Sequence, residues 1–357
     1  MNILFFSGKI IYGGGEKVRN WLANRLIGSG HIVYYATPTI NDDYIKDLEK
    51  VGLLNKVKII EYPFDKKNKS PFFYYRSITS LFKSNKIDLL IIFGGSLVEQ
   101  VIAKRNGVKI LLSERCDPAS RPILSRILKQ IQYRIADGYV FQTPEASLCY
   151  CKRAKKISTV IPNPIIDHLD EPQYKEYRNE IVTVGRLSPE KNQELLIDAF
   201  YLVHKKEPKY KLVIYGSGPL KEKLCSKIES LHLQDSVSIV SGKNNISELI
   251  VGSELFVLPS NTEGMPNALI EAMSVGLLCI SADCPIYGPR MLVRNGENGF
   301  LFPIKDKTAL YNTMLNAINL NSSEKEKIRK SATDIRETLQ EDKIFDRWNE
   351  YISSMFK

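Results

Sequence analysis

Two carboxylates stand on either side of a proline in TEGMPNALIEAM, residues 262–273. Pro266 fits the first turn of a helix, because its missing N–H would have no partner there. Glu263 then precedes the helix, and Glu271 lies more than a turn inside it. A helix N-terminus favours an anion, and a carboxylate accepts hydrogen bonds from neutral hydroxyls. The spacing indicates two acids that hold sugar and ribose hydroxyls beside a phosphate; a capped surface helix with two solvated acids is the alternative.

Two cations follow an apolar strand earlier in the chain. In VTVGRLSPEKN, residues 182–192, the strand ends at Gly185 and Arg186, and Lys191 stands where the next helix begins. Open parallel sheets bind ligands at the carboxyl ends of their strands, and cations there suit phosphates. We therefore expect Arg186 and Lys191 to hold a diphosphate, although either alone would more simply be a solvated surface charge.

These residues need a scaffold of strands, and the first half of the chain predicts one. Short apolar runs alternate with helical or mixed stretches at residues 2–7, 31–37, 56–62, 88–95, 108–114 and 137–143. Continuous apolar strands that alternate with helices are typical of a parallel sheet covered on both faces.

The same pattern restarts after residues 158–165, STVIPNPI, whose prolines suggest a linker. Strands are expected at 181–187, 211–218, 236–242, 255–260 and 278–283, and helices near 191–206, 219–232, 246–251, 266–275 and 306–319. We predict an α/β fold of two facing Rossmann-like domains, residues 1–163 and 164–343, with the ligand in the cleft between them. A C-terminal helix, residues 344–357, is expected to pack back onto the first domain.

Charge is unevenly distributed over the 357 residues. Residues 1–163 hold 26 Lys and Arg against 13 Asp and Glu, a net charge of +13, whereas the whole chain carries +10. The first half is therefore expected to meet an anionic partner.

Six cysteines without C-x-x-C spacing suggest reduced thiols in a cytoplasm. No apolar stretch approaches the ~18–20 residues that span a bilayer.

Several motifs, taken in order, resemble the family 4 glycosyltransferases, which have the two-domain GT-B fold. They are GGGEKVRNWLANRLIGSGHIV (13–33), VIPNPI (160–165), VGRLSPEKN (184–192), EGMPNALIEAM (263–273) and DCPIYGPRMLVRNGENGFLFP (283–303). The resemblance spans nearly the whole chain. It implies transfer of a sugar from a nucleotide sugar with retention of configuration and without an obligatory metal or other cofactor. The chain also lacks the D-x-D triplet, which holds a metal in the other main glycosyltransferase fold.

The resemblance also implies roles for residues of the second half. Arg186 and Lys191 match the family's diphosphate-binding pair, next to Gly185. Glu263 would hold the hydroxyls of the donor sugar, and Glu271 the ribose. Backbone around sugar and phosphate would come from Gly264, Met265, Pro266 and Asn267, and the border of the nucleobase from Lys243, Asn244 and Ile246.

In the first half, Gly14 and Gly15 match the loop that closes over phosphate and acceptor. Many family members carry a His near the reacting carbon, but residues 111–122 read LLSERCDPASRP and contain none. This stretch looks like the S-E-R-x-D-P variant of bacterial enzymes that extend lipid-linked oligosaccharides. Arg115 would then contact the acceptor's diphosphate or the donor, and Glu114 would orient Arg115. The alternative is that this segment only caps the next helix.

Two segments of the first half bear on a membrane. In residues 121–139 the apolar side chains fall on one face of a helix, with Arg126 and Lys129 on the other, and such a face more often belongs to a core. Residues 66–86, KKNKSPFFYYRSITSLFKSNK, interleave aromatic residues with lysines. A basic domain of this kind suits an anionic membrane surface.

The sequence thus favours a retaining transferase that moves a hexose or N-acetylhexosamine, with a preference for GalNAc, Gal or Glc, from a UDP-sugar to a polyprenyl-diphosphate-linked saccharide. It would act at the cytoplasmic face of the plasma membrane, in bacterial polysaccharide or glycan synthesis. One alternative is a nucleotide-sugar 2-epimerase of the same shape. Another is a basic nucleic-acid-binding protein, but no binding motif for nucleic acid is present. A nicotinamide dehydrogenase is disfavoured because the G-x-G-x-x-G spacing is missing.

Overall fold

The chain folds into two compact units, one of residues 1–166 and 341–357 and one of residues 167–340. The computed structural model describes residues 1–10, 13–62, 70–93, 97–115, 123–166, 177–241, 246–285 and 288–357. The C-terminal segment of the first unit begins at Glu341, and the boundary between the units follows Ile166. Our sequence-based boundaries were residues 344 and 163.

The first unit contains a seven-stranded sheet of order β3-β2-β1-β4-β5-β6-β7. Its strands are β1 (Asn2–Phe6), β2 (Ile32–Thr37), β3 (Lys58–Glu61), β4 (Leu89–Ile92), β5 (Lys109–Ser113), β6 (Gly138–Phe141) and β7 (Ser158–Val160). Every pair in it is parallel. The central strands are almost wholly apolar and buried, as a sheet covered on both faces requires.

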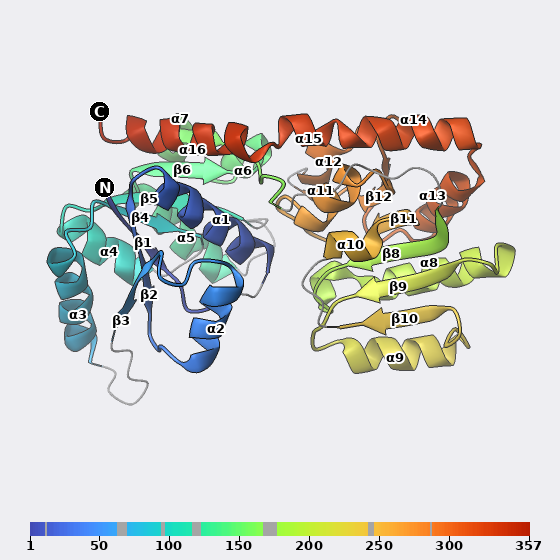
Figure 1. The fold of residues 1–357 in the computed structure, drawn as a ribbon, viewed down its shortest axis with the longest axis horizontal. Coiled ribbons are helices and arrows are strands. Elements are labelled where there is room, and N and C mark those ends of the chain that lie inside the picture. The colour runs from blue at the N-terminus through green and yellow to red at the C-terminus, as the bar shows by residue number, and fades with distance from the viewer. Residues whose placement is uncertain are drawn as a thin grey trace. The chain divides into compact units, whose positions relative to one another are not determined.

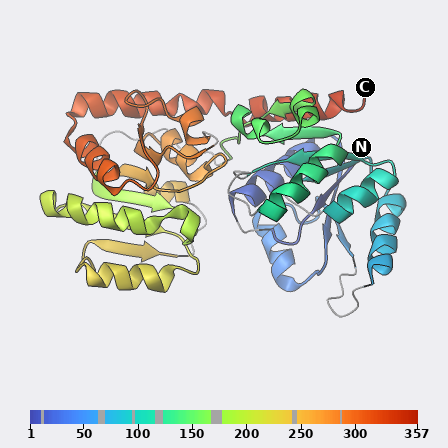
Figure 2. The ribbon, with the colours of Figure 1, turned by 180° about the vertical axis from the view of Figure 1, so that it is seen from behind.

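Helices cover both faces of this sheet. They are α1 (Gly14–Gly28), α2 (Asp42–Lys50), α3 (Pro71–Ser84), α4 (Leu97–Arg105), α5 (Ile123–Ile135), α6 (Pro144–Leu148), α7 (Lys152–Lys156) and α16 (Glu341–Ser354). In Figure 1, α1 and α2 lie in front of the sheet, and α3, α4 and α5 come forward in the reverse view of Figure 2. The chain's last helix, α16, packs on this unit, where Phe345 meets Trp21 and the Tyr351 hydroxyl accepts from the N–H of Tyr139.

One segment that we expected to be a linker is a strand. Ser158, Thr159 and Val160 form β7, which pairs with Tyr139, Val140 and Phe141 of β6 at the edge of the sheet. The prolines that suggested a linker follow the strand instead of replacing it. Only the residues beyond Val160 leave the sheet.

Two residues of the apolar face expected for α5 are exposed. The side chains of Ile127 and Ile131 are 55% and 41% exposed, whereas Lys129 is only 13% exposed. Lys129 points inward because a buried carboxylate, Glu114, lies 3.5 Å from its ammonium group. The apolar face of this helix is therefore not part of the core at these two positions.

The second unit contains a six-stranded parallel sheet of order β10-β9-β8-β11-β12-β13. Its strands are β8 (Arg178–Val184), β9 (Lys211–Tyr215), β10 (Val237–Val240), β11 (Ser253–Leu258), β12 (Leu278–Ala282) and β13 (Phe300–Phe302). The order reverses between β8 and β11, as it does between β1 and β4 in the first sheet. In such sheets ligands bind outside the carboxyl ends of the strands at this reversal.

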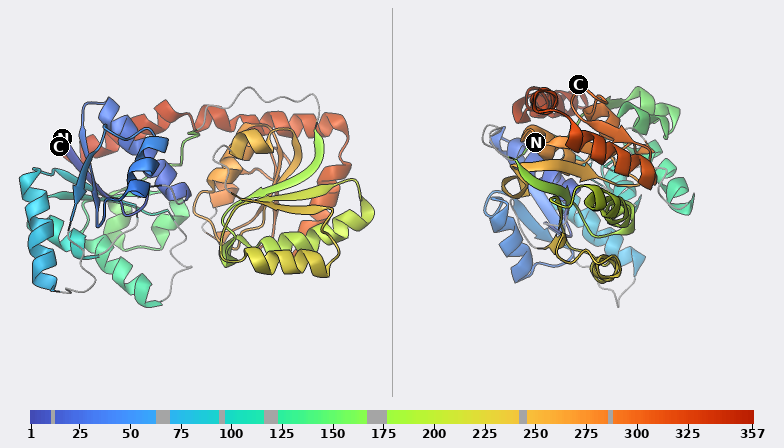
Figure 3. Two further views of the ribbon diagram at one scale, coloured as in Figure 1. Left: turned by 60° about the horizontal axis from the view of Figure 1, so that its bottom comes forward. Right: turned by 90° about the vertical axis from the view of Figure 1, so that its right-hand side faces the viewer.

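Helices again lie on both faces of the sheet (Figure 3). They are the 3-10 turn η2 (Pro189–Lys191) and the helices α8 (Gln193–Lys206), α9 (Lys221–Ser230), α10 (Ile246–Ile250), α11 (Asn267–Ser274), α12 (Gly288–Leu292), α13 (Lys307–Asn319), α14 (Ser322–Thr333) and α15 (Ile335–Thr338). Side-chain caps fix several starts: Asp306 accepts from the N–H of Ala309, and Asn321 and Glu324 form a capping box. Within the described ranges, no helix has the length and apolarity needed to cross a membrane.

Candidate functional site

The two predicted cations stand at the carboxyl end of β8. Gly185 and Arg186 follow the strand directly, and Lys191 ends the short turn η2. A β-carbon added to Gly185 would lie 3.6 Å from the side chain of Lys191. The lysine side chain therefore lies in van der Waals range of the end of the strand.

Lys191 forms an ion pair with Glu263. The ammonium nitrogen lies 2.6 Å from a carboxylate oxygen, and the two side chains are 25% and 10% exposed. The pair connects the loop after β8 with the loop after β11, the two strands between which the sheet order reverses. Residues 72 positions apart in sequence are thereby joined at the place where such a sheet binds ligands.

Backbone and amide contacts fasten the same two loops together. The N–H of Asn261 donates to the carbonyl of Glu190 at 2.8 Å, and the Asn192 amide donates to the Asn261 side chain at 3.1 Å. Asn192 adopts the left-handed conformation, with φ of 52°, before α8 begins. Asparagine tolerates that conformation better than most residues, so it suits this turn.

Glu190 adds a negative charge next to the pair. Partial burial alone would raise its pKa, but the hydroxyl of Ser188 donates to the carboxylate at 2.6 Å, and Lys191 and Arg186 lie nearby. These contacts, with its own backbone N–H, bring the pKa of Glu190 below its ordinary value. The carboxylate is therefore ionised at neutral pH.

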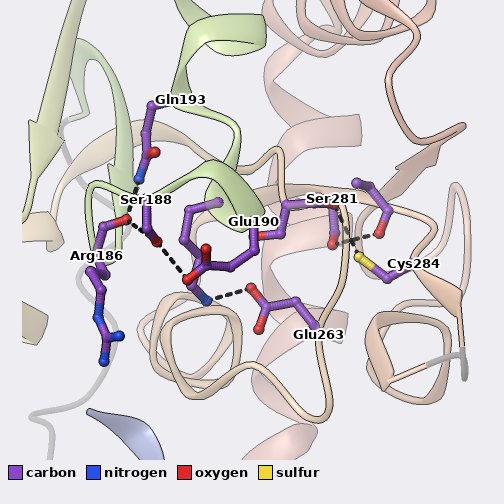
Figure 4. Close-up of polar contacts among 10 residues, drawn as sticks. Arg186, Ser188, Glu190, Gln193, Glu263, Ser281 and Cys284 are labelled. Carbon is purple, nitrogen blue, oxygen red and sulfur yellow. Dashed lines mark hydrogen bonds and ion pairs between the residues drawn. The ribbon is translucent and has the colours of Figure 1, made fainter. Parts of the chain in front are cut away.

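Arg186 is exposed, and its backbone is fixed. Its carbonyl accepts hydrogen bonds from the Gln193 amide at 2.9 Å and the Ser188 hydroxyl at 3.5 Å. In Figure 4 its side chain extends away from these two residues. The exposed guanidinium and the Lys191 ammonium thus stand at the end of the same strand.

The glycines of YGSGPL, residues 215–220, serve the packing of the protein itself. A β-carbon on Gly216 would lie 1.9 Å from the carbonyl oxygen of Gly185, and one on Gly218 would lie 2.4 Å from that of Leu187. In the structure they let this turn approach the loop that carries Arg186.

The loop 263–267 ends in α11. Pro266 is the N-cap residue and Asn267 the first helical residue, so the helix begins one position later than expected. Gly264, Met265 and Pro266 are buried, and Glu271, inside the helix, is 8% exposed. Figure 4 shows the Glu263 carboxylate among the polar residues of the neighbouring loops.

Gly288 supports this loop from behind. A β-carbon at Gly288 would lie 1.5 Å from the carbonyl oxygen of Gly264 and 3.5 Å from the α-carbon of Met265. Any side chain there would displace the loop that follows Glu263. The resemblance included Gly288 in a motif, but no role for Gly288 was predicted, because its contact with Gly264 joins residues far apart in the chain.

The expected nucleobase border lies mostly outside the described residues. Lys243 and Asn244 belong to that undescribed stretch, and Ile246 is the first residue of α10.

In the first unit, Gly14 and Gly15 are the first two residues of α1, not part of a loop before it. A β-carbon on Gly15 would have no atom within 4 Å.

Glu114 and Arg115 follow β5 in the first unit, and the structure gives them different surroundings. Glu114 is buried and accepts from the hydroxyls of Tyr150 and Tyr133 at 2.8 and 3.2 Å, close to Lys129. Arg115 is half-buried and donates to the Asn163 side chain at 2.6 Å. The tyrosines and Asn163 were not recognised as part of this site from the sequence.

The fold has solved relatives over its full length. The pneumococcal O-GlcNAc transferase GtfA, determined in complex with UDP and GlcNAc, matches with a TM-score of 0.83 at 14% identity, covering 100% of this chain and 99% of that chain. Two Rossmann-like units with parallel sheets define the fold as GT-B, which confirms the predicted α/β class.

The chain belongs to the group 1 glycosyltransferases and is an enzyme of that kind. The family described as glycosyl transferases group 1 matches residues 167–334. An uncharacterised glycosyltransferase of Methanocaldococcus jannaschii is 32% identical over 278 residues, 68% of each chain. A Campylobacter jejuni enzyme is 26% identical over 337 residues, 91% of each chain; its name is GalNAc-alpha-(1->4)-GalNAc-alpha-(1->3)-diNAcBac-PP-undecaprenol alpha-1,4-N-acetyl-D-galactosaminyltransferase.

Proposed function

We propose that this glycosyltransferase moves a hexose or N-acetylhexosamine from a UDP-sugar to a polyprenyl-diphosphate-linked saccharide, with retention of configuration. The observation that carries the proposal is the joining of Lys191 and Glu263 at 2.6 Å, beside Arg186, at the ends of β8 and β11. In this proposal, Lys191 would bind a phosphate and Glu263 would bind sugar hydroxyls. The motifs quoted above support placement in family 4, in the S-E-R-x-D-P variety.

The donor diphosphate would lie against Arg186 and Lys191. These two cations would stabilise the charge that grows on the leaving nucleotide, so no obligatory metal is proposed. Glu263 would accept from hydroxyls of the donor sugar, and Glu271 from those of the ribose. The presence of UDP in the solved GtfA complex supports uracil as the base.

The transfer step has simple requirements. The acceptor hydroxyl oxygen forms a bond to the anomeric carbon, and the bond from that carbon to the β-phosphate oxygen breaks. The departing phosphate accepts the proton of the acceptor hydroxyl on the same face of the sugar. Retention follows because the new bond forms on the face that the phosphate leaves.

The acceptor is proposed to bind the first unit. The name of the Campylobacter jejuni relative supports a lipid diphosphate, since it describes transfer of GalNAc to an undecaprenyl-diphosphate-linked glycan. Arg115 would contact the acceptor diphosphate, and the N–H groups of Gly14 and Gly15, at the start of α1, would lie near phosphate. Lys243, Asn244 and Ile246 would border the base.

A membrane surface fits the proposed acceptor. Residues 1–163 carry a net charge of +13, and each cation near an anionic surface contributes about 1 kcal/mol. Exposed apolar residues stand on the helices of this unit: Phe72 and Phe73 on α3, and Ile127 and Ile131 on α5. The protein is therefore proposed to bind the cytoplasmic face of the membrane peripherally.

A transfer assay tests the proposal. The purified protein is incubated with a panel of UDP-, GDP- and dTDP-sugars, with and without a polyprenyl-diphosphate-linked saccharide, and products are separated by mass spectrometry. We expect the acceptor to gain one sugar from a UDP-linked donor only. Conversion of UDP-GlcNAc to its 2-epimer without any acceptor would instead favour the epimerase, and no transfer from any UDP-sugar would refute the proposal.

A further inference from the structure

Arg115 lies over an aromatic pair at the carboxyl edge of the first sheet. The central carbon of its guanidinium is 4.4 Å from the ring centre of Phe93 and 5.6 Å from that of Trp348. Phe93 follows β4, whereas Trp348 belongs to α16, near the end of the chain. Residues from three distant parts of the sequence therefore meet at this arginine.

The aromatic pair is a firm support. The rings of Phe93 and Trp348 are stacked, with centroids 6.1 Å apart and planes 14° apart. Trp348 is fully buried, and Phe93 also packs against Phe5 of β1. Neither ring can turn without disturbing the core, so both offer a fixed surface to the guanidinium.

An amide completes the arrangement. The side-chain oxygen of Asn163 accepts from Arg115 at 2.6 Å and from the Gln142 amide at 2.7 Å. Asn163 is buried, and Gln142 follows β6. Ring faces and an amide oxygen can together hold a guanidinium in one place.

We propose that Trp348, with Phe93, is a positioning residue that orients Arg115 toward the diphosphate of the acceptor. The inference rests on the proposed function, in which Arg115 contacts that diphosphate. In this inference the last helix, α16, contributes to acceptor binding through Trp348. The physical benefit is preorganisation: an arginine already ordered loses less conformational freedom when the anion binds.

The chain offers a matched control on the same helix. Phe345 is buried in α16, meets Trp21 edge to face with centroids 6.4 Å apart, and has the Arg25 guanidinium 4.9 Å from its ring. It resembles Trp348 in burial and in its arginine neighbour, but it does not touch Arg115 in the described contacts. Phe345→Leu therefore reproduces the loss of packing without the loss of support.

Steady-state kinetics with varied acceptor provide the first test. We expect Trp348→Leu and Phe93→Leu to raise the KM for the acceptor about tenfold, because an aromatic contact to a cation is lost. Donor hydrolysis without acceptor should stay within about twofold of wild type, as should the acceptor KM of Phe345→Leu. Trp348→Phe should retain most of the wild-type KM: among the described residues the indole N–H has no hydrogen-bond partner, so phenylalanine loses none.

A double-mutant test with Arg115 shows whether Trp348 positions that arginine or only stabilises the fold. In an Arg115→Ala background, Trp348→Leu should change the acceptor KM by less than about twofold, since its partner is already gone. An equal effect in both backgrounds, or an equal effect of Phe345→Leu, would overturn the inference. If Trp348→Leu does not fold, Phe93→Leu, at a half-buried position, replaces it in the same comparison.

A crystal structure of Trp348→Leu separates this inference from the proposed function. A displaced or disordered Arg115 guanidinium supports positioning by Trp348, and an unmoved guanidinium contradicts it. If Arg115→Ala leaves the acceptor KM unchanged, the proposed role of Arg115 fails whatever the crystal structure shows. The two failures are thus distinguishable.

Discussion

Lys191 and Glu263 neutralise each other in the ligand-free protein, and the proposed function gives them separate partners. Binding of a diphosphate would draw the ammonium group from the carboxylate, which is then available to sugar hydroxyls. In the proposed function, the 2.6 Å contact would hold both groups at the donor site before the donor arrives. Such preorganisation avoids the cost of assembling charged side chains during the reaction.

Substitution of the two glutamates should separate their roles. Glu263→Ala is expected to lower the transfer rate about 100-fold or more, because a contact made in the transition state is lost. Its UDP affinity should stay near that of wild type, since Lys191 remains and is released from its ion pair. Calorimetric titration with UDP and a transfer assay measure the two effects.

Glu271→Ala should act on the nucleotide instead. Loss of a carboxylate that accepts from ribose hydroxyls is expected to weaken UDP binding about tenfold or more. Glu271→Gln, which keeps the volume of this buried side chain, controls for packing in α11. Unchanged UDP affinity in both variants would contradict the assigned role.

The loop 263–267 packs closely against the start of α12. Gly288, the first residue of α12, lies so close to Gly264 that a β-carbon would fall 1.5 Å from the carbonyl oxygen. The loop must shift to accommodate any side chain, and a 1 Å displacement at a reacting centre costs about 100-fold in rate. Gly288 thereby sets where the loop after Glu263 lies.

Gly288→Ala is therefore expected to reduce kcat/KM for the donor about 100-fold, while overpacking lowers the free energy of unfolding by about 1–3 kcal/mol. Kinetics with varied donor and thermal unfolding by circular dichroism measure both. Gly28→Ala is the control, because a β-carbon there would have no atom within 4 Å. Wild-type kinetics for Gly288→Ala would show that the loop does not need this close contact.

A buried ion cluster joins α14 to β11. Glu254 lies 2.7 Å from both Lys325 and Arg329, and all three side chains are largely shielded from water. Removing the carboxylate would leave two cations without their shared partner. This cluster fixes the start of β11, the strand that leads to Glu263.

Glu254→Ala is accordingly expected to lower the free energy of unfolding by about 3–5 kcal/mol. Glu297→Ala removes one member of the exposed pair with Arg294 and should cost no more than about 1 kcal/mol. Denaturant titration followed by circular dichroism compares the two variants. Equal losses would mean that the buried cluster contributes little.

The sequence predicted most elements because their signals are local. Apolar runs located the strands that end near Arg186 and Glu263, and Pro266 located the start of α11 to within one residue. The strand β7 was missed because it is three residues long and precedes prolines. The helical pattern of α5 did not predict the exposure of Ile127 and Ile131 or the burial of Lys129. The buried Glu114 that draws Lys129 inward lies outside the helix.

The site was predictable only in part for the same reason. Arg186, Lys191 and Glu263 follow strands whose carboxyl ends meet, so the sheet pattern brings them together. Gly288 and Trp348 act through contacts with residues distant in sequence, which no local pattern contains. Such residues are found from the packing of the folded chain.

Charge gives the whole molecule a polarity along its sequence. Residues 1–163 carry a net charge of +13, whereas the whole chain carries +10. The remaining residues are therefore net negative. An anionic surface would therefore attract the first unit, which is proposed to hold the lipid-linked acceptor, and would repel the net-negative remainder. The distribution suits an enzyme that meets its acceptor at a membrane and its donor from solution.

Vesicle sedimentation tests this distribution. The protein is expected to bind vesicles that contain about 30% anionic lipid in low salt and to be released by about 0.5 M salt, where the Debye length is only a few ångströms. Ile131→Glu, at an exposed position of α5, should bind the same vesicles in low salt more weakly than wild type. Equal binding to neutral vesicles would rule out a charge-based attraction.

A crystal structure of the protein with UDP tests the central claim most directly. The account predicts the diphosphate within about 3 Å of the Lys191 ammonium and the Arg186 guanidinium, with the Lys191–Glu263 contact opened and the ribose beside Glu271. UDP bound elsewhere, with Lys191 still paired to Glu263, would contradict it.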